Sequence, residues 1–508
     1  MPNSKALICI AIILSVLMAS GAINAQTVLN HYRLGTQRMP LSERLSNGNI
    51  LVGWESLASG RRGPLLEVYT PDFSPLHSVD QYAASNHSLA SGKAVIAASE
   101  DSFFVAAFAR WTGYDSTDKS IYVRKFDNSG QQQSGDVMVN NYSSGDQWIE
   151  DLLIDDNTET IFVVWGSHPV SNPNQRHYYM RTFDFSLNPI SDDIPVYIGD
   201  DETIWLKDVG FLSSAKIIFA FFHTYDFDYQ NVLASYMDFD GSNQSDLFIV
   251  NTQQIGIQYW PSITAIQGGG VLIIWSEIVG IYEASIRGRR FDANGNPIDF
   301  TDVLLTVPDS NNNGNSNVQN SGHAALNSDG DTYMLTWTQH KNESSAIFKL
   351  MGRFLDFTLQ PVSDTFTISS TAGCDYPEVL ELWPNNFSVT WSMLGDPGYS
   401  TDIYGTIVPY PNTIVDYEFV QLPEFQSIAY PNPFNSSTTI KLELDQGSNA
   451  LVEIYDSLGR QVQILVNEYL GTGSHQINFN ADGLPSGTYF YRVHTDHFSE
   501  TNKVSLLK

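Results

Sequence analysis

The chain has 508 residues, and its 56 acidic against 26 basic residues give a formal net charge of −30. Such a balance argues against nucleic acid as a partner, because phosphate backbones bind basic surfaces. Of the 2 cysteines, only Cys374 lies outside the apolar leader described below, so an internal disulfide is excluded once the leader is removed. Burial of apolar surface must therefore hold the fold together.

Residues 1–25 have the pattern of a secretory signal peptide. Lys5 precedes an unbroken apolar run from Ala6 to Met18, and small residues follow up to Ala25. The run is shorter than the roughly 18 to 20 residues that a membrane-spanning helix needs, and no later stretch is long enough. We expect cleavage after Ala25 or Ala22, with no transmembrane segment left in the mature protein.

Apolar runs that each end in a bulky aromatic residue recur along most of the remaining chain. They end at Trp54, Trp111, Trp165, Phe222, Trp275, Trp337 and Trp391, with steps of 57, 54, 57, 53, 62 and 54 residues. A turn-rich segment precedes each run, an alternating run follows it, and a short fourth strand follows in most repeats. Four antiparallel strands at this period are typical of one propeller blade. The sequence therefore predicts an all-β fold with a seven-bladed β-propeller over residues 26–408.

The ends of the repeat array predict how the ring closes. No fourth strand follows the third strand of the last repeat, residues 402–408, whereas an extra strand, residues 27–33, precedes the first repeat. A closed ring hides its last sheet edge. We therefore expect the N-terminal strand to complete the seventh blade.

Two repeated features favour structural roles. The aromatic residue at the end of each second strand is expected to fill the space between blades. Four third strands also place an arginine three residues before an aspartate, as in Arg124–Asp127, Arg181–Asp184, Arg289–Asp292 and Arg353–Asp356. Repetition in four blades favours a structural ion pair or turn over ligand binding.

No motif identifies a catalytic centre. The sequence has no Gly-x-Ser-x-Gly elbow, His-Glu-x-x-His helix, phosphate loop or dinucleotide fingerprint. Its histidines are scattered singly, which argues against a metal cage. Paired carboxylates for glycoside hydrolysis stay open, because the separation that they need is spatial. No catalytic residue is assigned, and no cofactor is expected apart from the calcium considered next.

The residues Asp309, Asn311 and Asn313, followed by Gly314, resemble the opening of a calcium loop. The twelfth position of the motif is Asn320 rather than a bidentate glutamate, so the charge is too low for tight binding. A plain loop is the favoured interpretation, and weak calcium binding is the alternative.

Large ring side chains near the starts of the first strands are the candidate ligand-binding residues. They are Trp148, Trp205, Trp260, His323 and Tyr376. In a propeller the loops entering the first strands and those joining second to third strands open on one face, so these side chains would surround the channel mouth. Aromatic rings among polar neighbours suit stacking on sugars. Alternatively, the same side chains plug the channel as core.

A second domain follows residues 409–427, which contain Pro409, Pro411 and Pro423 and are expected to form a linker. From residue 428, short alternating strands separated by glycine-containing turns predict a small β-sandwich. Its segments 430–435, 452–460, 484–491 and 503–508 resemble the type A C-terminal sorting domain of the type IX secretion system of Bacteroidetes-like bacteria. The motif residues are Tyr430, Pro431, Asn432, Pro433, Gly459, Gly487, Tyr489, Lys503 and Lys508.

That resemblance implies an Ig-like sandwich, recognition by the outer-membrane export machinery, and a protein that is secreted or surface-attached. The Ig-like domain of flagellar hook-capping proteins is a similar alternative. The whole sequence then predicts an exported, non-catalytic scaffold that binds polysaccharide or protein. The alternatives are a secreted polysaccharide hydrolase or lyase and a structural surface or adhesion component. Close acids deep in the channel would favour the enzyme, and an aromatic rim without them would favour binding.

Overall fold

The computed structural model divides the chain into two compact units, residues 1–415 and 416–508. It describes residues 26–507 except 32–35, 59–60, 86–88, 113–117, 142–144, 169–174, 200–202, 225–228, 254–255, 280–282, 307–316, 342–347, 371–372, 396–399, 411–426, 431, 433, 445–446, 457–459 and 496–498. The predicted signal peptide, most of the predicted linker, and the candidate residues Asp309, Asn311, Asn313, Pro431, Pro433, Gly459 and Lys508 lie outside the described residues. Within the described part, no helix is long and apolar enough to cross a membrane.

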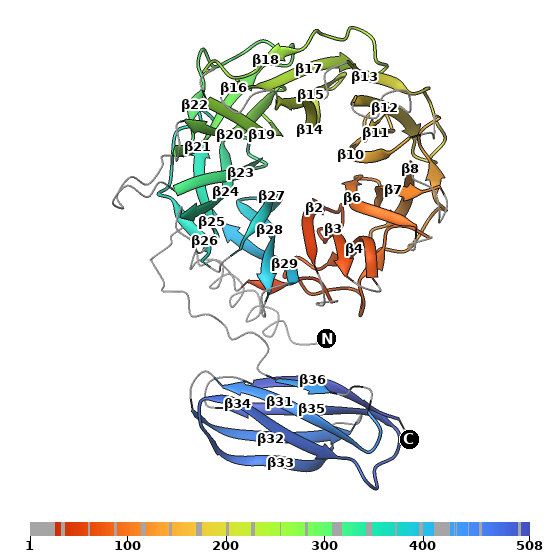
Figure 1. Cartoon of the computed structure of the whole chain (residues 1–508), viewed down its shortest axis with the longest axis vertical. Helices are drawn as coiled ribbons and strands as arrows, with labels where there is room; N and C mark the ends of the chain where they lie inside the picture. The colour runs from red at the N-terminus through yellow and green to blue at the C-terminus, as the bar shows by residue number, and fades with distance from the viewer. Residues whose placement is uncertain are drawn as a thin grey trace, which may run out of the picture. The chain divides into compact units, whose positions relative to one another are not determined.

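The first unit is a ring of seven antiparallel blades around a central channel, as the repeat spacing predicts (Figure 1). From the channel outward, blade 1 contains β2 (Gln37–Arg44), β3 (Ile50–Ala58), β4 (Arg61–Tyr69) and β5 (Gln81–Tyr82). Blade 2 contains β6 (Ala90–Ala98), β7 (Phe103–Trp111), β8 (Lys119–Asp127) and β9 (Val137–Met138). Blade 3 contains β10 (Gln147–Asp155), β11 (Thr160–Ser167), β12 (His177–Asp184) and β13 (Ile194–Ile198).

The remaining blades follow the same order. Blade 4 contains β14 (Ile204–Ser213), β15 (Lys216–His223), β17 (Val232–Asp238) and β18 (Phe248–Ile249). Blade 5 contains β19 (Gly256–Ala265), β20 (Val271–Val279), β21 (Glu283–Phe291) and β22 (Val303–Leu304), and β16 (Tyr229–Gln230) pairs in parallel with β19. Blade 6 contains β23 (Asn317–Leu326), β24 (Thr332–Lys341), β25 (Phe348–Asp356) and β26 (Phe366–Ser369).

Blade 7 closes the ring with the N-terminal strand. It contains β27 (Asp375–Trp383), β28 (Asn386–Gly395) and β29 (Ser400–Pro409), with β1 (Thr27–Val28) as its outermost strand. Thr27 lies opposite Gly405, and the backbone N–H of Leu29 donates to the carbonyl of Ile403 at 2.7 Å. The Asn30 side chain then accepts from the Ile403 N–H at 2.7 Å. The expected closure is confirmed, although the regular strand is shorter than residues 27–33.

One large aromatic side chain per blade fills the space between adjacent blades. Five of them are tryptophans at most 1% exposed, namely Trp54, Trp165, Trp275, Trp337 and Trp391. Strand register assigns the other two places to Phe108 and Phe221. The aspartate that ends the third strand gives a common reference point in these blades. In blade 3 it pairs with Thr160, and Trp165 lies five residues later; Phe108 and Phe221 lie at the same distance from the paired residue in blades 2 and 4.

The expectation that Trp111 and Phe222 occupy these positions is therefore wrong. Both side chains are only partly buried, whereas Phe108 and Phe221 have no exposed area. A neighbouring aromatic on the same strand concealed the true position in each case. The number of repeats is unchanged.

Three of the four repeated arginines bond backbone carbonyls of the previous blade instead of pairing with the aspartates three residues later. In blade 3, Arg181 donates from Nε to the Ser191 carbonyl at 2.9 Å and from a terminal nitrogen to the Val139 carbonyl of blade 2 at 2.6 Å. Arg289 and Arg353 make the equivalent pairs of contacts. The expected ion-pair partner is therefore wrong, but the role of these arginines is structural.

Arg124 differs from the other three because its close partner is a buried carboxylate of its own blade. Its guanidinium is 1% exposed and lies 2.6 Å from the carboxylate of Asp136. The aspartates at the ends of these third strands instead anchor turns. Asp127, for example, accepts backbone N–H bonds from Ser129 at 2.9 Å and Gln131 at 3.0 Å.

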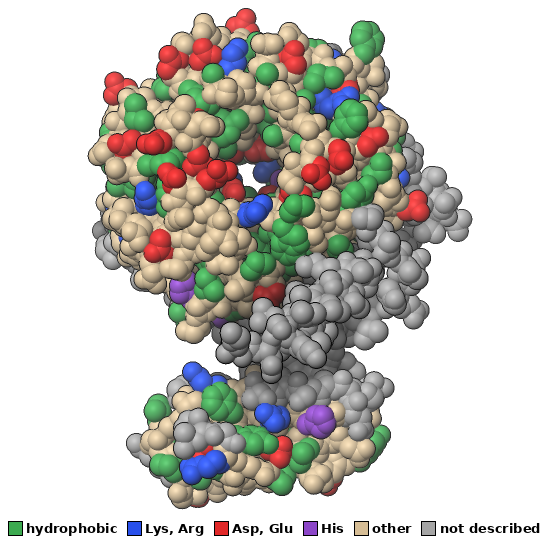
Figure 2. Space-filling model, turned by 180° about the vertical axis from the view of Figure 1, so that it is seen from behind, with side chains coloured by type: hydrophobic (Ala, Val, Ile, Leu, Met, Phe, Trp, Pro, Cys, Tyr) green, Lys and Arg blue, Asp and Glu red, His purple; other side chains and the backbone are tan. Residues whose placement is uncertain are grey.

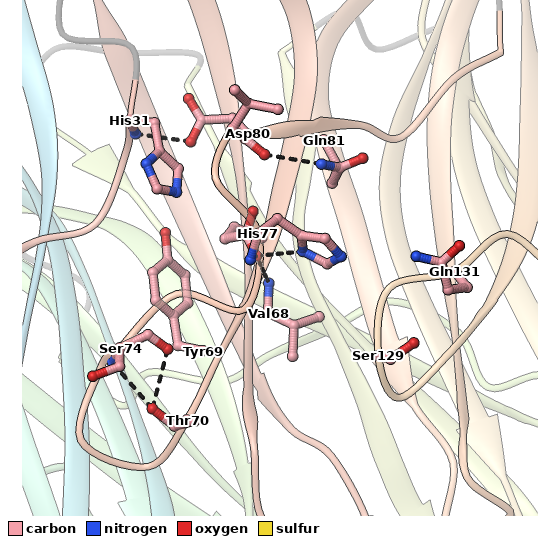
Figure 3. Close-up of polar contacts among 12 residues, drawn as sticks. His31, Val68, Tyr69, Thr70, Ser74, His77, Asp80, Gln81, Ser129 and Gln131 are labelled. Carbon is pink, nitrogen blue, oxygen red and sulfur yellow. Dashed lines mark hydrogen bonds and ion pairs between the residues drawn. The ribbon is translucent and has the colours of Figure 1, made fainter. Parts of the chain in front are cut away.

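The junction between blades 7 and 1 uses different residues (Figure 3). Glu67 occupies the register position of the arginines, opposite Val52. The Tyr69 hydroxyl donates to the Leu29 carbonyl at 2.5 Å, and the His31 N–H donates to Asp80 at 2.8 Å. A neutral phenol therefore ties the closing segment to the next blade.

The second unit is a two-sheet β-sandwich. One sheet contains β30 (Ser427–Tyr430), β31 (Ser437–Leu444) and β34 (Gly473–Asn480). The other contains β33 (Gln461–Leu470), β32 (Ser448–Asp456), β35 (Gly487–Thr495) and β36 (Ser499–Leu506) in spatial order. Alternate side chains of both sheets meet in one apolar core that includes Val452, Phe479 and Val504.

Candidate functional site in the propeller channel

Every innermost strand is interrupted by a β-bulge or irregularity in its pairing with the second strand. The interruptions fall between Arg38 and Leu41, Ser91 and Val95, Ile149 and Asp151, Leu206 and Asp208, Tyr259 and Ser262, Asn320 and His323, and Asp375 and Glu378. A bulge bends the strand and re-aims its side chains. Because the bulges share one register level, they gather side chains from different blades around the channel.

The bulges bring together a set of charged and polar residues that we call the charged belt. It consists of Lys93, Glu150, Asp151, Lys207, Asp208, His323 and Glu378, all of them partly buried. The belt residues come from blades 2, 3, 4, 6 and 7. Figure 2 shows the opening at the centre of the ring, with acidic and basic side chains along its edge.

Enclosure by the channel wall raises the pKa of several carboxyl groups. Burial, and then the negative charge of Asp208, raises the pKa of Glu378 to about 8. Burial raises the pKa of Glu150 to about 7, against the opposing effect of Lys93. The Glu378 side chain still exposes 24% of its area, because it borders the open channel rather than a closed core. Both groups can therefore exchange protons near neutral pH.

Two belt aspartates also tie adjacent blades together. Asp151 accepts a hydrogen bond from the Val209 N–H of blade 4 at 3.2 Å, and Asp208 accepts one from the Ile263 N–H of blade 5 at 2.6 Å. Each also bonds the N–H that follows it in its own strand. The backbone therefore positions the carboxylates of Asp151 and Asp208. The partly buried side chains of Glu150, Lys207 and Glu378 suit contact with a ligand.

Two predicted ligand-binding residues, Trp260 and Tyr376, form an aromatic pair beside the belt. Their ring centroids are 6.3 Å apart, and the ammonium of Lys207 lies 5.0 Å from the centroid of the Trp260 ring. Both residues have left-handed backbone conformations, with φ of 55° at Trp260 and 51° at Tyr376. Such strain costs about 1–3 kcal/mol for a bulky residue and is concentrated at functional sites.

His323, also predicted from the sequence, belongs to the belt. Its Nδ1 lies 3.5 Å from a carboxylate oxygen of Glu378. Burial, and then the charge of Lys207, lowers the pKa of His323 to about 3. The imidazole is therefore neutral at physiological pH and adds no positive charge next to Glu378.

The other two predicted aromatic residues are placed differently. Trp148 packs against His168 with ring centroids 4.6 Å apart, and its indole N–H donates to Glu150, which connects it to the belt. Trp205 is 37% exposed, and the Arg176 guanidinium lies 3.6 Å from its ring centroid. The structure thus brings Trp260, His323 and Tyr376 together, connects Trp148 to them through Glu150, and shows no contact of Trp205 with that group.

Sequence reasoning missed the charged members of the belt. Four of them form two adjacent charged pairs, Glu150-Asp151 and Lys207-Asp208, within otherwise alternating first strands. Such pairs break the alternation of a regular strand and indicate a bulge. Met39, Trp260 and Tyr376 each precede a proline at the same level and share a positive φ. Among the described residues, no group of three or more His, Cys, Asp or Glu side chains could hold a metal ion.

The described sorting-motif residues lie around the last strand of the sandwich. The Asn432 amide donates to the Lys503 carbonyl and accepts from the Ser505 N–H, both at 2.9 Å. Phe434 also lies along this strand, because it forms an isolated parallel β-bridge with Leu506. Tyr430 ends β30, Gly487 begins β35, and the hydroxyl of the buried Tyr489 donates to the Pro485 carbonyl at 2.9 Å. The motif at the start of the module thus covers the edge of its terminal strand.

Comparison with known families identifies this module. Residues 428–506 match the secretion system C-terminal sorting domain. The second unit is therefore a type IX sorting domain, as its motifs indicate. It directs export through the secretion machinery, so the protein is secreted or attached to the cell surface.

Solved structures similar to the chain include propellers with different functions. A Dyadobacter fermentans protein of unknown function is 11% identical, with 76% of this chain and 98% of that chain covered and a TM-score of 0.47. A PL25 ulvan lyase is 10% identical, with coverages of 76% and 96% and a TM-score of 0.47. A Penicillium chrysogenum α-L-arabinanase bound to arabinobiose is 11% identical, with coverages of 76% and 98% and a TM-score of 0.42. No curated protein sequence matches the chain.

Proposed function

We propose that the propeller is an exported polysaccharide-binding scaffold, with the ligand held at the aromatic pair and the charged belt. The observation that carries this proposal is the placement of Trp260 and Tyr376, whose strained backbones hold two rings 6.3 Å apart beside Lys207. Flat aromatic faces stack on the apolar faces of sugar rings, and nearby charged groups bind hydroxyls. Export by the sorting domain places this site where extracellular polymers are met.

Native electrophoresis in gels containing a polymer tests the proposal. The probes are arabinan, xylan, pectin and ulvan, which cover neutral and acidic polysaccharides. We expect at least one polymer to retard the full chain, and Trp260→Ala or Tyr376→Ala to weaken retention at least about tenfold, which corresponds to about 1.4 kcal/mol. The matched control is Phe300→Ala, since Phe300 is 93% exposed and lies in the outer connection of blade 5.

The outcomes of this experiment separate the candidate functions. Retardation by none of the four polymers, or equal retention of the three variants, would contradict the proposed site. A protein ligand or a purely structural surface role would then be the better interpretation. Retention that Trp260→Ala abolishes and Phe300→Ala preserves would support it.

Polysaccharide cleavage is a second candidate, and one observation favours it. The belt places carboxyl groups whose pKa values are raised to about 7 and about 8 beside the aromatic pair. Acids tuned toward neutral pH are a feature of enzyme active sites. The channel therefore combines aromatic side chains with carboxyl groups, which is the arrangement that favours an enzyme.

A further inference from the structure

We infer that the charged belt hydrolyses a glycosidic bond of the bound polymer, with Glu378 as the general acid and Glu150 as the general base. This inference rests on the polysaccharide binding proposed above. It adds a reaction and assigns its residues.

The two carboxyl groups come from opposite parts of the ring. Glu378 is on β27 of blade 7, which packs against β2 and β23, and Glu150 is on β10 of blade 3, which packs against β6 and β14. Two blades separate them on one side and three on the other (Figure 1). Hydrolysis with inversion needs an acid and a base that flank the sugar from opposite sides.

The same neighbours nevertheless act on both groups, so they face one stretch of the channel. Glu150 and Glu378 each interact electrostatically with Lys93, Lys207 and Asp151. Both also lie at the bulge of their own innermost strand. A sugar bound in this stretch would have one carboxyl group on each side.

Their surroundings give the two groups different protonation states. Glu378 faces Asp208, Asp151, Lys207, Lys93 and the neutral imidazole of His323, and enclosure favours its protonated form. Glu150 faces both lysines and accepts the Trp148 indole N–H, which makes its carboxylate easier to form, whereas the charge of Asp151 opposes its ionisation. The higher pKa of Glu378, about 8 against about 7 for Glu150, agrees with an acid and a base in these roles.

The reaction is an addition of water across the glycosidic bond. Glu378 gives its proton to the glycosidic oxygen as the bond from that oxygen to the anomeric carbon breaks. Glu150 takes a proton from water, and the water oxygen forms the new bond to the anomeric carbon. The products are a new reducing end and a free hydroxyl, and proton exchange with solvent restores both carboxyl groups. Tyr376, two residues before Glu378, would position the sugar.

Release of reducing ends from a retained polymer tests the inference. The full chain is incubated with each polymer that retards it, and new reducing ends are measured between pH 6 and 9. We expect Glu378→Gln and Glu150→Gln to lower the rate by about 10²- to 10⁴-fold while retention in the gel persists. Glu100→Gln, at an exposed turn of blade 2, is the control and should keep the wild-type rate.

A second readout separates chemistry from damage to the fold. The wild-type rate should peak between about pH 7 and pH 8, because Glu150 must be ionised while Glu378 is protonated. Each glutamine variant should lose one limb of that profile in its residual activity.

Three results would overturn the inference. The first is retention of a polymer without new reducing ends at any tested pH, which would leave the binding proposal intact. The second is an ultraviolet-absorbing unsaturated end, since elimination adds no water. The third is an unchanged rate in both glutamine variants. Absence of retention by every polymer would instead contradict the proposed function itself.

Discussion

The outer strands of the blades and their innermost strands obey different rules. Second and third strands repeat the same solutions around the ring, namely one buried aromatic, an arginine that reaches the previous blade and an aspartate that anchors a turn. The innermost strands share only a bulge, and the side chains at that bulge differ from blade to blade.

We interpret this difference as a division between structural and functional positions within one repeat. A position that is the same in most blades is needed by every blade, so it holds the ring together. At the bulges the backbone is the same in each blade but the residue type differs. Such a position can contribute to a site shared by the whole ring, because each blade forms one part of the wall of a single channel. The predictions below test whether this division is real.

The largest effect is expected at the aromatic positions between blades. Phe221→Ala should lower the free energy of unfolding by about 3–5 kcal/mol, because it empties a fully buried site. Its chain neighbour is a matched control, since Phe222 is partly buried and stacks on Trp205 with ring centroids 6.5 Å apart. Phe222→Ala should cost about 1 kcal/mol. Equal losses in urea-induced unfolding would refute the register derived for blade 4.

The next effect concerns the repeated arginines of the third strands. Arg124→Met should cost about 3 kcal/mol, because it leaves the 4% exposed carboxylate of Asp136 with Arg110 as its remaining cation. Arg353→Met should cost about 1 kcal/mol, since it removes two long hydrogen bonds of 3.3 Å each to backbone carbonyls and leaves no buried carboxylate without its partner. Chemical unfolding of both variants measures the difference. A larger loss at Arg353 would contradict the ranking by burial.

A smaller, pH-dependent effect is expected at Glu43, which lies in the first innermost strand. Burial, and then the charge of Asp151, raises its pKa from 4.5 to about 8. The folded chain therefore keeps a proton that the unfolded chain loses, and this stabilisation is full below pH 4.5 and disappears as the pH rises through 8. Glu43→Gln should raise Tm above wild type by about 2–4 °C at pH 8.5.

At pH 5 the same substitution should change Tm much less, since the folded carboxyl is protonated and the pH is only slightly above the unfolded pKa of 4.5, so most of the stabilisation remains. Glu100→Gln, at an exposed turn, should show no such pH dependence. A constant Tm difference across this range would mean that Glu43 ionises normally.

The smallest effect on stability, with a large effect on binding, is expected at Trp260. Glycine adopts a φ of 55° without strain, so Trp260→Gly relieves the backbone while it removes packing. We expect the free energy of unfolding to change by less than about 1 kcal/mol and retention by polysaccharide to disappear. A loss in the free energy of unfolding as large as that of Phe221→Ala would show that Trp260 stabilises the fold instead.

The same division explains how far the sequence could be interpreted. The spacing of apolar runs predicted seven blades, and the absence of a fourth strand after residues 402–408 predicted closure by Thr27 and its neighbours. The aromatic positions failed in two blades because Phe108 and Phe221 have aromatic neighbours on the same strand. The partners of Arg181 and Arg289 were missed because they are backbone carbonyls of the previous blade, which no side-chain pattern encodes.

The charged belt was beyond sequence reasoning for a physical reason. Glu150 and Glu378 border the same channel only because the ring brings blades 3 and 7 around it, and each lies at a bulge rather than in regular alternation. Trp260 and Tyr376 were found because aromatic residues at strand starts are conspicuous, but their positive φ angles have no signature other than the proline that follows.

The closing strand also sets the order in which the propeller can fold. Asn30 bonds Ile403, which lies 373 positions later in the sequence, so the ring stays open until almost the whole propeller sequence is available. Contacts this distant in sequence are slow to form, because loop closure costs entropy before the strand pairing repays it. Once formed, they connect the first and last blades, so no blade can detach as a terminal unit. Resistance to unfolding should therefore depend on a few residues at the start of the propeller, and trimming the chain through Asn30 should accelerate unfolding far more than the small number of removed contacts would indicate.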